Sequence, residues 1–362
     1  MIVIPKKGYK LNFACILTTG RTGSDFLQGC LDGIPGIITF SGEIPFYKFI
    51  NDPNTKKILN NNNYNKLILL FIKKHHNLFY KDNLENKKIS LKIQKFKKIF
   101  LQLSKNKNLN RKTFLENLYL SYHLTLNRNI LKKNIIVHHS HNVTETEMFL
   151  KDFKNAKILV TIRNPMQNLK SGIDNWIRYD KNKKNFEHFF FYVRRIREDL
   201  NFAIRKKRFL CIKLEEMNLN KTKRNILKFL NIGYSKLINI STFAGKPWKS
   251  DKISNFKVRD GKFNKSVLQE NWKDFYSAKD LLILNFLYYK YSKFGYKIRK
   301  LSISQKVCLP FLFFFPLKFE QKMLKDIVLQ PSLSIFIKNI YYYIRKILYF
   351  FKIYLTNIIA YE

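Results

Sequence analysis

The stretch LTTGRTGSDFLQGC, residues 17–30, decides the fold, because a glycine-containing turn follows an apolar run there. Residues 11–18, LNFACILT, are short, apolar and followed at once by Gly and Ser, which predicts a buried strand. From Thr22 to Asp32 the apolar residues recur at helical spacing, and Gly33 is a typical helix stop. We therefore expect a strand, a tight turn and a helix in succession.

The turn TTGRTGS has the composition of an anion-binding loop. Backbone N–H groups at a helix N-terminus and the positive end of the helix dipole together attract phosphate or sulfate. The glycines permit close approach of the backbone, the hydroxyls donate, and the arginine adds a planar cation. The predicted binding residues are Thr19, Gly20, Arg21, Thr22, Gly23 and Ser24. The same residue types also serve strand-to-helix turns that bind nothing.

Strand and helix patterns alternate along much of the remaining chain. Further strands are expected at 36–40, 134–139, 157–162 and 208–213, and helices at 22–32, 144–154, 165–178, 222–230 and 278–293. Thr144 and Glu147 have the spacing of a capping box for the helix at 144–154. Such alternation predicts an α/β fold, a parallel sheet flanked by helices in a three-layer sandwich. Ligands of these sheets gather at the carboxyl ends of the strands.

Residues 51–134 interrupt the alternation and are rich in Asn and Lys. Helical stretches are expected there at 64–80, 89–104 and 113–132. We interpret this segment as a helical insertion and not as a separately folding domain. The predicted organisation is an α/β domain over residues 1–300 and a helical C-terminal extension over residues 301–362.

The charge is strongly basic, with 68 Lys and Arg against 25 Asp and Glu and a net charge of +43. That balance attracts phosphates, sulfates, nucleic acid or anionic lipid. The chain is also loaded with Asn, Ile, Phe and Tyr, residues of A/T-rich codons, so lysine can also have spread over solvated faces without any partner. With no domain-scale arginine-rich groove, nucleic acid is not expected as a partner.

The cysteines and the N-terminus indicate the compartment. Cys15, Cys30, Cys211 and Cys308 are far apart and mostly in apolar surroundings, which favours reduced core residues over disulfides or a metal site. The N-terminal MIVIPKKGYK has too short an apolar run for a signal peptide. The expected location is cytoplasmic.

The extension at 301–362 is aromatic and basic. Lys338, Arg345 and Lys352 repeat every seven residues and predict a narrow cationic stripe on an otherwise apolar helix. No uninterrupted 18-residue apolar run exists, which argues against a transmembrane span. Two interpretations stay open: a helix in the interface of the inner face of a membrane, or a helix that packs on the globular domain or on a second subunit.

A second motif, VTIRNPMQNLKSG, also follows an expected strand. Arg163 ends the strand, Pro165 suits the first turn of a helix, and Ser171 comes eight residues after the arginine. A guanidinium and a hydroxyl in this arrangement can grip one phosphate from two sides. Alternatively, Arg163 caps the sheet edge and Ser171 is an exposed helix residue.

Together, TTGRTGSDFL and RNPMQNLKS resemble two motifs of the nucleotide-sulfate-dependent sulfotransferases, which use 3′-phosphoadenosine 5′-phosphosulfate (PAPS) as donor. IKLEEM, residues 212–217, is similar to a later segment of that family, although Leu214 replaces its usual tyrosine. The resemblance covers residues 11–296, is weak across 51–134 and is absent after about residue 300. An arginine in the first loop, Arg21, places the chain closer to the carbohydrate and bacterial branches than to members with lysine.

The resemblance implies a division of labour between the motifs. The first loop is expected to hold the 5′-phosphosulfate, and Arg163 and Ser171 the 3′-phosphate. Arg259 and Lys262, in FKVRDGKFNKS, are further candidates for the 3′-phosphate.

Sulfuryl transfer also needs a base and a cation that balances charge on the leaving oxygen. Glu43 lies just past the second expected strand, and the carbohydrate and tyrosylprotein sulfotransferases use a glutamate in a similar place, so we favour Glu43 as base. The alternative is a loop carboxylate that pairs with a lysine. His141, in VHHSHN, is the second candidate, as base or as a sulfate contact. Arg21 is expected to stabilise charge across the bridging oxygen. No metal is expected, because neighbouring histidines on a strand point to opposite faces.

Two functions from different classes follow. The first is PAPS-dependent sulfation of a hydroxyl or amine on an acceptor such as a cell-surface glycan, a glycolipid or a small molecule. The alternative is a non-catalytic protein on the same scaffold that binds a membrane surface or a polyanion. A nucleoside kinase is disfavoured, since the sequence lacks a G-x-x-x-x-G-K-[ST] loop.

Overall fold

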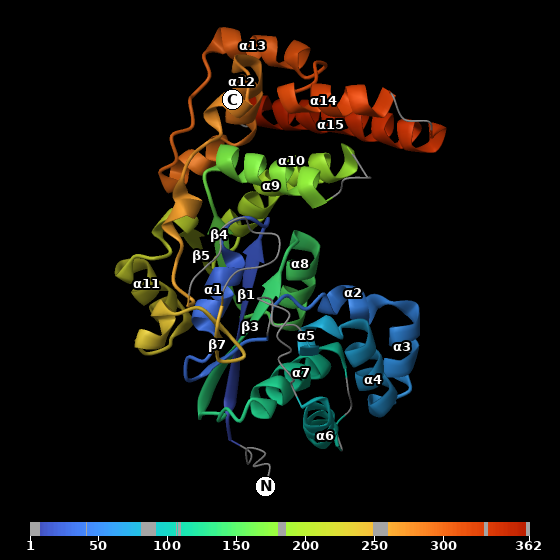
Figure 1. The fold of residues 1–362 in the computed structure, drawn as a ribbon, viewed down its shortest axis with the longest axis vertical. Helices are drawn as coiled ribbons and strands as arrows, with labels where there is room; N and C mark the ends of the chain where they lie inside the picture. The colour runs from blue at the N-terminus through green and yellow to red at the C-terminus, as the bar shows by residue number, and fades with distance from the viewer. Residues whose placement is uncertain are drawn as a thin grey trace. The chain divides into compact units, whose positions relative to one another are not determined.

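The computed structural model describes residues 8–40, 42–80, 92–105, 107, 110–179, 186–248, 260–328 and 332–359. The chain forms two compact units, labelled by element in Figure 1. Unit 1 comprises Met1–Thr161 and Ala203–Leu268, and unit 2 comprises Ile162–Phe202 and Gln269–Glu362. These boundaries differ from the expected domains at 1–300 and 301–362, because the C-terminal helices share a unit with the helices that follow Arg163.

Unit 1 is built on a five-stranded sheet with the strand order β2-β3-β1-β4-β5. The strands are β1 (Lys10–Thr18), β2 (Ile37–Ile38), β3 (Lys133–Ser140), β4 (Lys157–Ile162) and β5 (Phe209–Lys213). β1 pairs in parallel with β3 and β4, and β2 pairs in parallel with β3. The predicted parallel α/β sheet is thus confirmed, although the strand expected at 36–40 is only two residues long.

The strand order creates a switch point beside β1. From β1 the chain runs in one direction along the strand order, past β3 to β2. From β4 it runs in the opposite direction, to β5. The carboxyl ends of the neighbouring strands β1 and β4, at Thr18 and Thr161, pair with each other. Connections that leave in opposite directions open a crevice at such a point, which is where open α/β sheets bind ligands.

The helices of unit 1 belong to two hydrophobic cores, one on each face of this sheet. They are α1 (Ser24–Leu31), α2 (Phe46–Asn51), α3 (Pro53–Asn60), α4 (Tyr64–Lys74), α5 (Asn77–Tyr80), α6 (Ile93–Ser104), α7 (Arg111–Thr125), α8 (Val143–Asp152) and α11 (Asn220–Leu230). Side chains of β1 alternate between two cores: Cys15 joins the one under the insertion, and Ile16 joins the one under α1 and α11. A small hairpin, β6 (Thr242–Phe243) and β7 (Lys246–Pro247), completes the unit.

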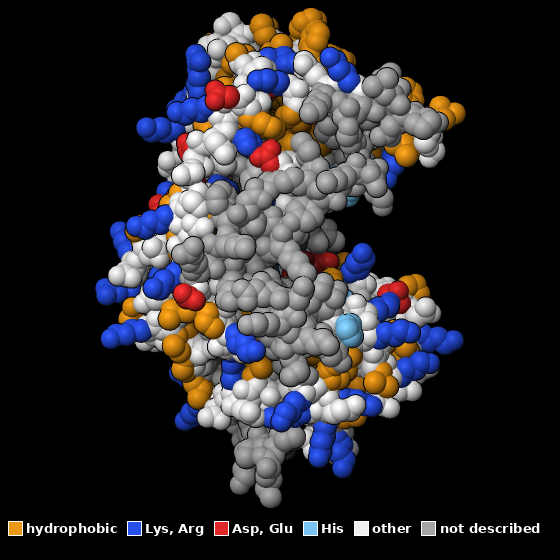
Figure 2. All heavy atoms as spheres, viewed as in Figure 1, with side chains coloured by type: hydrophobic (Ala, Val, Ile, Leu, Met, Phe, Trp, Pro, Cys, Tyr) orange, Lys and Arg blue, Asp and Glu red, His pale blue; other side chains and the backbone are white. Residues whose placement is uncertain are grey.

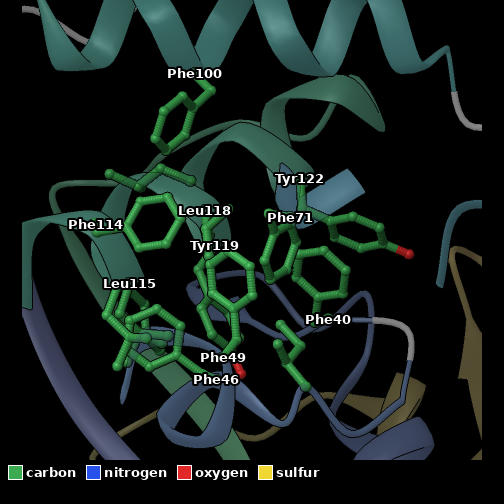
Figure 3. Close-up of a cluster of buried hydrophobic side chains, with 14 of the residues drawn as sticks. Phe40, Phe46, Phe49, Phe71, Phe100, Phe114, Leu115, Leu118, Tyr119 and Tyr122 are labelled. Atoms are coloured by element: carbon green, nitrogen blue, oxygen red, sulfur yellow. The ribbon is translucent and has the colours of Figure 1, made fainter. Parts of the chain in front are cut away.

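The described part of 51–134 contains the helices α3, α4, α5, α6 and α7, and its last two residues already belong to β3. Its aromatic side chains form one cluster with residues of the sheet edge (Figure 3). Phe40, which follows β2, stacks on Tyr122 of α7 with ring centroids 4.0 Å apart, and Ile136 of β3 belongs to the same cluster. The insertion therefore shares its core with the sheet.

The start of α8 corrects one prediction. Asn142, and not Thr144, is the N-cap, and its side chain accepts a hydrogen bond from the Glu145 backbone N–H at 2.7 Å. Asn is an equally good capping residue, so the helix begins earlier than the expected Thr144–Glu147 box.

Unit 2 is helical. Its helices are α9 (Pro165–Tyr179), α10 (Phe186–Ile204), α12 (Ala278–Leu287), α13 (Ile303–Leu312), α14 (Lys318–Val328) and α15 (Leu333–Ile359). α9 begins at Pro165 as predicted, and the Asn164 side chain caps it by accepting from the Met166 N–H at 3.0 Å. The expected helix at 278–293 ends as α12 at Leu287 and continues as a 3₁₀ turn, Tyr289–Phe294. α10 was not predicted.

Among the residues that the structure describes, no helix combines the length and the apolar composition needed to cross a membrane.

A buried ion pair fixes the end of α1 within unit 1. Arg128 contacts Asp32 through two nitrogens, at 2.5 and 3.1 Å, and the side chains are 17% and 4% exposed. The Asp32 carboxylate also accepts from the Thr242 hydroxyl at 2.9 Å and the Gly245 N–H at 3.1 Å. One carboxylate thereby joins α1 to the hairpin.

Removal of Arg128 should be costly, because it leaves the Asp32 charge buried without its partner. We expect Arg128→Ala to lower the free energy of unfolding by about 3 kcal/mol. Lys74→Ala is the control: Lys74 pairs with Asp52 at 3.2 Å with both side chains well exposed, so its loss should cost less than about 1 kcal/mol. Urea unfolding measures both, and equal losses would contradict the assignment.

Candidate active site

The loop between β1 and α1 has an unusual backbone. Gly20, Arg21 and Gly23 all have positive φ, at 93°, 58° and 80°. A left-handed arginine is uncommon and costs energy unless the surroundings hold it in place. Gly23 is the N-cap of α1 and offers no side chain to cap it, so the first-turn N–H groups keep the orientation and polarity that bind anions.

Gly23 is also the point where a second motif packs on the loop. A Cβ built on Gly23 would lie 2.6 Å from Leu214 Cδ1 and 3.0 Å from Met217 Sδ. Both residues belong to IKLEEM, which forms a 3₁₀ turn, Leu214–Glu216, after β5. Contact and positive φ together require glycine at this position.

Hydroxyls of the loop are mostly buried. Thr22 Oγ1 lies 2.7 Å from Thr18 Oγ1 and 2.7 Å from Thr161 Oγ1, which ties the loop to the ends of β1 and β4. Its side chain is 1% exposed. These bonds give Thr22 a structural role that the sequence alone did not reveal. Thr19 and Ser24 are buried as well, and their part in ligand binding stays a prediction.

Glu43 and His141, the rival bases of the sequence analysis, lie next to each other. Glu43 Oε2 is 3.4 Å from His141 Nε2, and the two side chains are about one third exposed. The opposite nitrogen, His141 Nδ1, lies 3.9 Å from the Cβ position of Gly20. The imidazole therefore lies between the Glu43 carboxylate and the loop that is predicted to bind an anion.

His139 packs against His141 and is hydrogen-bonded to Gln28. Gln28 donates through Nε2 to the carbonyls of Phe40 and Gly42, at 2.8 and 3.1 Å, so its Oε1 accepts from His139 Nδ1 at 2.8 Å. Burial lowers the pKa of His139 to about 3, and the ring is neutral with its proton on Nδ1. Its ring centroid is 4.8 Å from that of His141.

Asp25 is a site residue that the sequence analysis missed. Its Oδ1 is 3.7 Å from His139 Nδ1. Desolvation raises the pKa of the Asp25 carboxyl, and the nearby His141 and Arg21 oppose that rise. Asp25 follows TTGRTGS directly and lies one helical turn before Gln28, but nothing in the sequence pairs it with histidines more than a hundred residues away.

The same three residues have metal-like spacing. Asp25, His139 and His141 each offer a ligand atom, and these atoms lie within 4.8 Å of one another. Strand alternation does send His138 to the other face, where it stacks on Phe149 at 5.1 Å. His139 and His141, however, are two residues apart and therefore lie on the same face. The expectation that no metal binds stays a prediction.

The residues predicted to bind the 3′-phosphate do not all belong to the same unit. Arg163 directly follows β4, is 8% exposed, and belongs to unit 2 together with the half-buried Ser171 on α9. Lys262 is exposed and belongs to unit 1. Arg259 lies outside the described residues. Their shared role stays a prediction.

Comparison with protein-family profiles and with curated proteins found no match. Among solved structures, the sulfotransferase domain of the Synechococcus PCC 7002 olefin synthase is similar with a TM-score of 0.45 and 14% identity, over 81% of this chain and 98% of that one. The sulfotransferase domain from the curacin biosynthetic pathway gives 0.41 and 15%, over 90% and 100%. A Mycobacterium avium sulfotransferase gives 0.35 and 14%, over 62% and 65%.

All three are sulfotransferases, the family that the two sequence motifs resemble. The TM-scores and identities are low, so the activity of this chain has to be inferred from its own residues.

The buried histidines predict a pH dependence of stability. Burial lowers the pKa of His138 and His139 to about 3 from the ordinary value of 6.5. The folded state therefore excludes protons that the unfolded state binds, so stability is full above pH 6.5 and is lost as the pH falls toward 3. Between about pH 7 and about pH 5, each histidine should reduce the free energy of unfolding by about 2 kcal/mol.

Urea unfolding at both pH values measures this loss. His138→Asn keeps a polar atom near Nδ1, which bonds the Tyr119 hydroxyl at 3.0 Å, and should remove that residue's share of the loss. His75 and His123, whose pKa burial lowers to about 4, should retain theirs. An unchanged pH dependence in the variant would show that His138 is not buried in its neutral form.

Proposed function

We propose that this chain is a sulfotransferase that transfers the sulfuryl group of PAPS to a hydroxyl or amine of an acceptor. The observation that carries the proposal is the Glu43–His141 pair beside the uncapped start of α1, with His141 Nδ1 near Gly20. An anion-binding loop and a proton acceptor thus lie together in one unit. Sulfuryl transfer to a hydroxyl needs both.

The loop suits the anionic end of such a donor. The backbone of Gly20–Ser24 and the Arg21 guanidinium would hold its phosphosulfate. Asp25 lies beside this loop, where burial raises the pKa of its carboxyl and the nearby His141 and Arg21 oppose that rise. For the 3′-phosphate, Arg163 and Ser171, with Arg259 and Lys262, remain the residues that the motifs predict.

The residues of the chain then divide the chemistry. The acceptor atom forms a bond to sulfur while the bond from sulfur to the bridging oxygen breaks, which leaves adenosine 3′,5′-bisphosphate. We assign the acceptor's proton to the Glu43–His141 pair: the carboxylate orients the imidazole through Nε2 and raises its basicity. Arg21 balances the charge that develops on the bridging oxygen.

The alternative, a non-catalytic protein that binds polyanions, has the net charge of +43 in its favour. It predicts no discrimination between anions of similar charge. The ligand experiment below separates it from the enzyme.

Adenosine 3′,5′-bisphosphate should stabilise the protein selectively. At about a hundred times its Kd it should add about 2.7 kcal/mol to the free energy of unfolding, and AMP at the same concentration much less. A thermal shift assay measures the difference, which Arg163→Ala should abolish. Arg299→Ala, which removes an exposed arginine of the same unit, is the control and should keep it. Equal shifts with bisphosphate, AMP and inorganic sulfate would favour the polyanion-binding alternative.

Glu43 and His141 should behave as one unit in catalysis. Glu43→Gln and His141→Gln are each expected to lower kcat for bisphosphate release from PAPS by about a hundredfold or more, and the double variant by little more than either. Full activity in His141→Gln, with loss in Glu43→Gln, would instead assign the proton to Glu43 alone. Bisphosphate-induced thermal shifts should survive in all three variants.

Replacement of Arg21 by glycine should raise the stability of the protein and lower its activity. Since glycine adopts positive φ without strain, Arg21→Gly should raise the free energy of unfolding by about 1 kcal/mol. The same change should remove about 3 kcal/mol of transition-state stabilisation, a roughly hundredfold lower kcat/KM. Asn231→Gly is the matched control: Asn231 ends α11 with φ 60°, so its replacement should stabilise without loss of activity. A fully active Arg21→Gly would contradict the assigned role.

A further inference from the structure

α15 has two opposite faces within unit 2. One face is buried: Asn339, Lys346, Phe350 and Ile353 are at most 3% exposed, and their spacing puts them on one side of a helix. Lys346 Nζ lies 2.5 Å from Glu320 Oε2, with both side chains fully buried. This face packs on α10 and α14, for example through Phe186 against Tyr343 at 5.3 Å.

The other face is a row of exposed apolar side chains. They recur three, four or seven residues apart and are 40–71% exposed: Leu333, Ile337, Ile340, Ile344, Leu348 and Leu355. With 3.6 residues per turn, this row lies on the side opposite Lys346. The packing of unit 2 therefore explains one face of α15 and leaves the other uncovered.

α13 repeats the pattern. Ile303, Val307 and Phe311, each four residues after the last, are 82%, 68% and 67% exposed, and Phe314 follows at 57%. Figure 2 shows hydrophobic side chains gathered over α13 at the top of the view. Exposed apolar patches of this extent mark interaction sites.

Basic residues predominate around these rows, although Lys338 Nζ lies 2.7 Å from Glu187 Oε2 of α10. Lys338, Arg345 and Lys352 border the α15 row, and the helix contains no Asp or Glu. Exposed Arg299 and Lys300 directly precede α13. Over residues 301–362 the sequence has eight Lys and Arg and three Asp and Glu.

Tyrosines lie where the apolar and charged parts meet. Tyr341 is 53% exposed, and the Arg345 guanidinium lies 5.5 Å from its ring centroid and 5.8 Å from that of Tyr342. Tyrosine and arginine with an apolar body and a polar tip are typical of the boundary between lipid and water.

We propose that the exposed faces of α13 and α15 are a docking surface for an anionic lipid bilayer, with the apolar rows among the acyl chain ends and the basic border at the headgroups. An amphipathic helix with this composition lies in the membrane interface. Each border lysine or arginine is attracted by anionic lipid. A second copy is a poorer occupant, because a symmetric pair of these faces would bring like charges together. This proposal does not rest on the proposed sulfotransferase activity.

Vesicle sedimentation of the full chain tests the apolar rows. Wild-type protein should bind vesicles of phosphatidylcholine with phosphatidylglycerol, and Ile337→Ser, Ile344→Ser and Leu348→Ser combined should weaken that binding by about tenfold or more. The matched control is Leu219→Ser, Leu237→Ser and Ile240→Ser in unit 1, where exposure is 43–55%, and it should bind like wild type. All six sites are exposed, so thermal unfolding should change little.

The basic border is tested separately. Arg299→Gln, Lys300→Gln and Lys352→Gln combined should reduce binding to the anionic vesicles about tenfold and weaken its salt dependence. Lys221→Gln, Lys228→Gln and Lys236→Gln, which remove the same charge from exposed sites in unit 1, should have a much smaller effect.

Absence of vesicle binding by the wild type, or equal losses in the test and control variants, would overturn the proposal. So would a dimer in sedimentation equilibrium that the α15 substitutions dissociate, if vesicle binding is unaffected by them.

Discussion

Three threonine hydroxyls hold the centre of unit 1 together. Thr22 contacts Thr18 and Thr161 at the point where the connections of β1 and β4 diverge. Without this link, the turn would be free to relax the left-handed arginine at its tip. Strained backbone persists at functional sites only where the surroundings over-determine it, and here the hydroxyls and the Gly23 contact with Leu214 do so. The shape of the loop, and with it the position of Arg21, rests on this buried contact.

Glu43 and His141, the two candidate bases, lie close enough to act as the pair proposed above. Both come from segments that follow strands at the carboxyl edge of the sheet, Glu43 after β2 and His141 after β3. A carboxylate that faces one imidazole nitrogen leaves the other nitrogen to face the loop. His139 and Gln28 form a neutral hydrogen-bonded layer beneath the pair. Glu43, Asp25 and Arg21 are the other ionisable side chains of the candidate site.

Much of the fold could be predicted from the sequence, because its strands are short apolar runs followed by glycine or polar punctuation. The boundaries of β3 and β4 and the start of α9 at Pro165 came from such local signals. Contacts between residues far apart in the sequence could not be predicted, because only the fold brings Asp25 and Gln28 to His139. The sequence also does not distinguish a threonine that binds a ligand from one, such as Thr22, that bonds the end of a strand. α10 was not predicted, although Asn185, a typical N-cap residue, directly precedes its first residue in the sequence.

The path of the chain between the two units carries a consequence for how the protein is made. The chain leaves unit 1 after Thr161, returns at Ala203 and leaves again after Leu268. A nascent chain therefore cannot complete the sheet until β5 has emerged from the ribosome, by which time α9 and α10 are already outside with much of their packing surface still unsynthesised. A single cut leaves at least one unit incomplete: a cut after Leu268 keeps all of unit 1 on one fragment but divides unit 2.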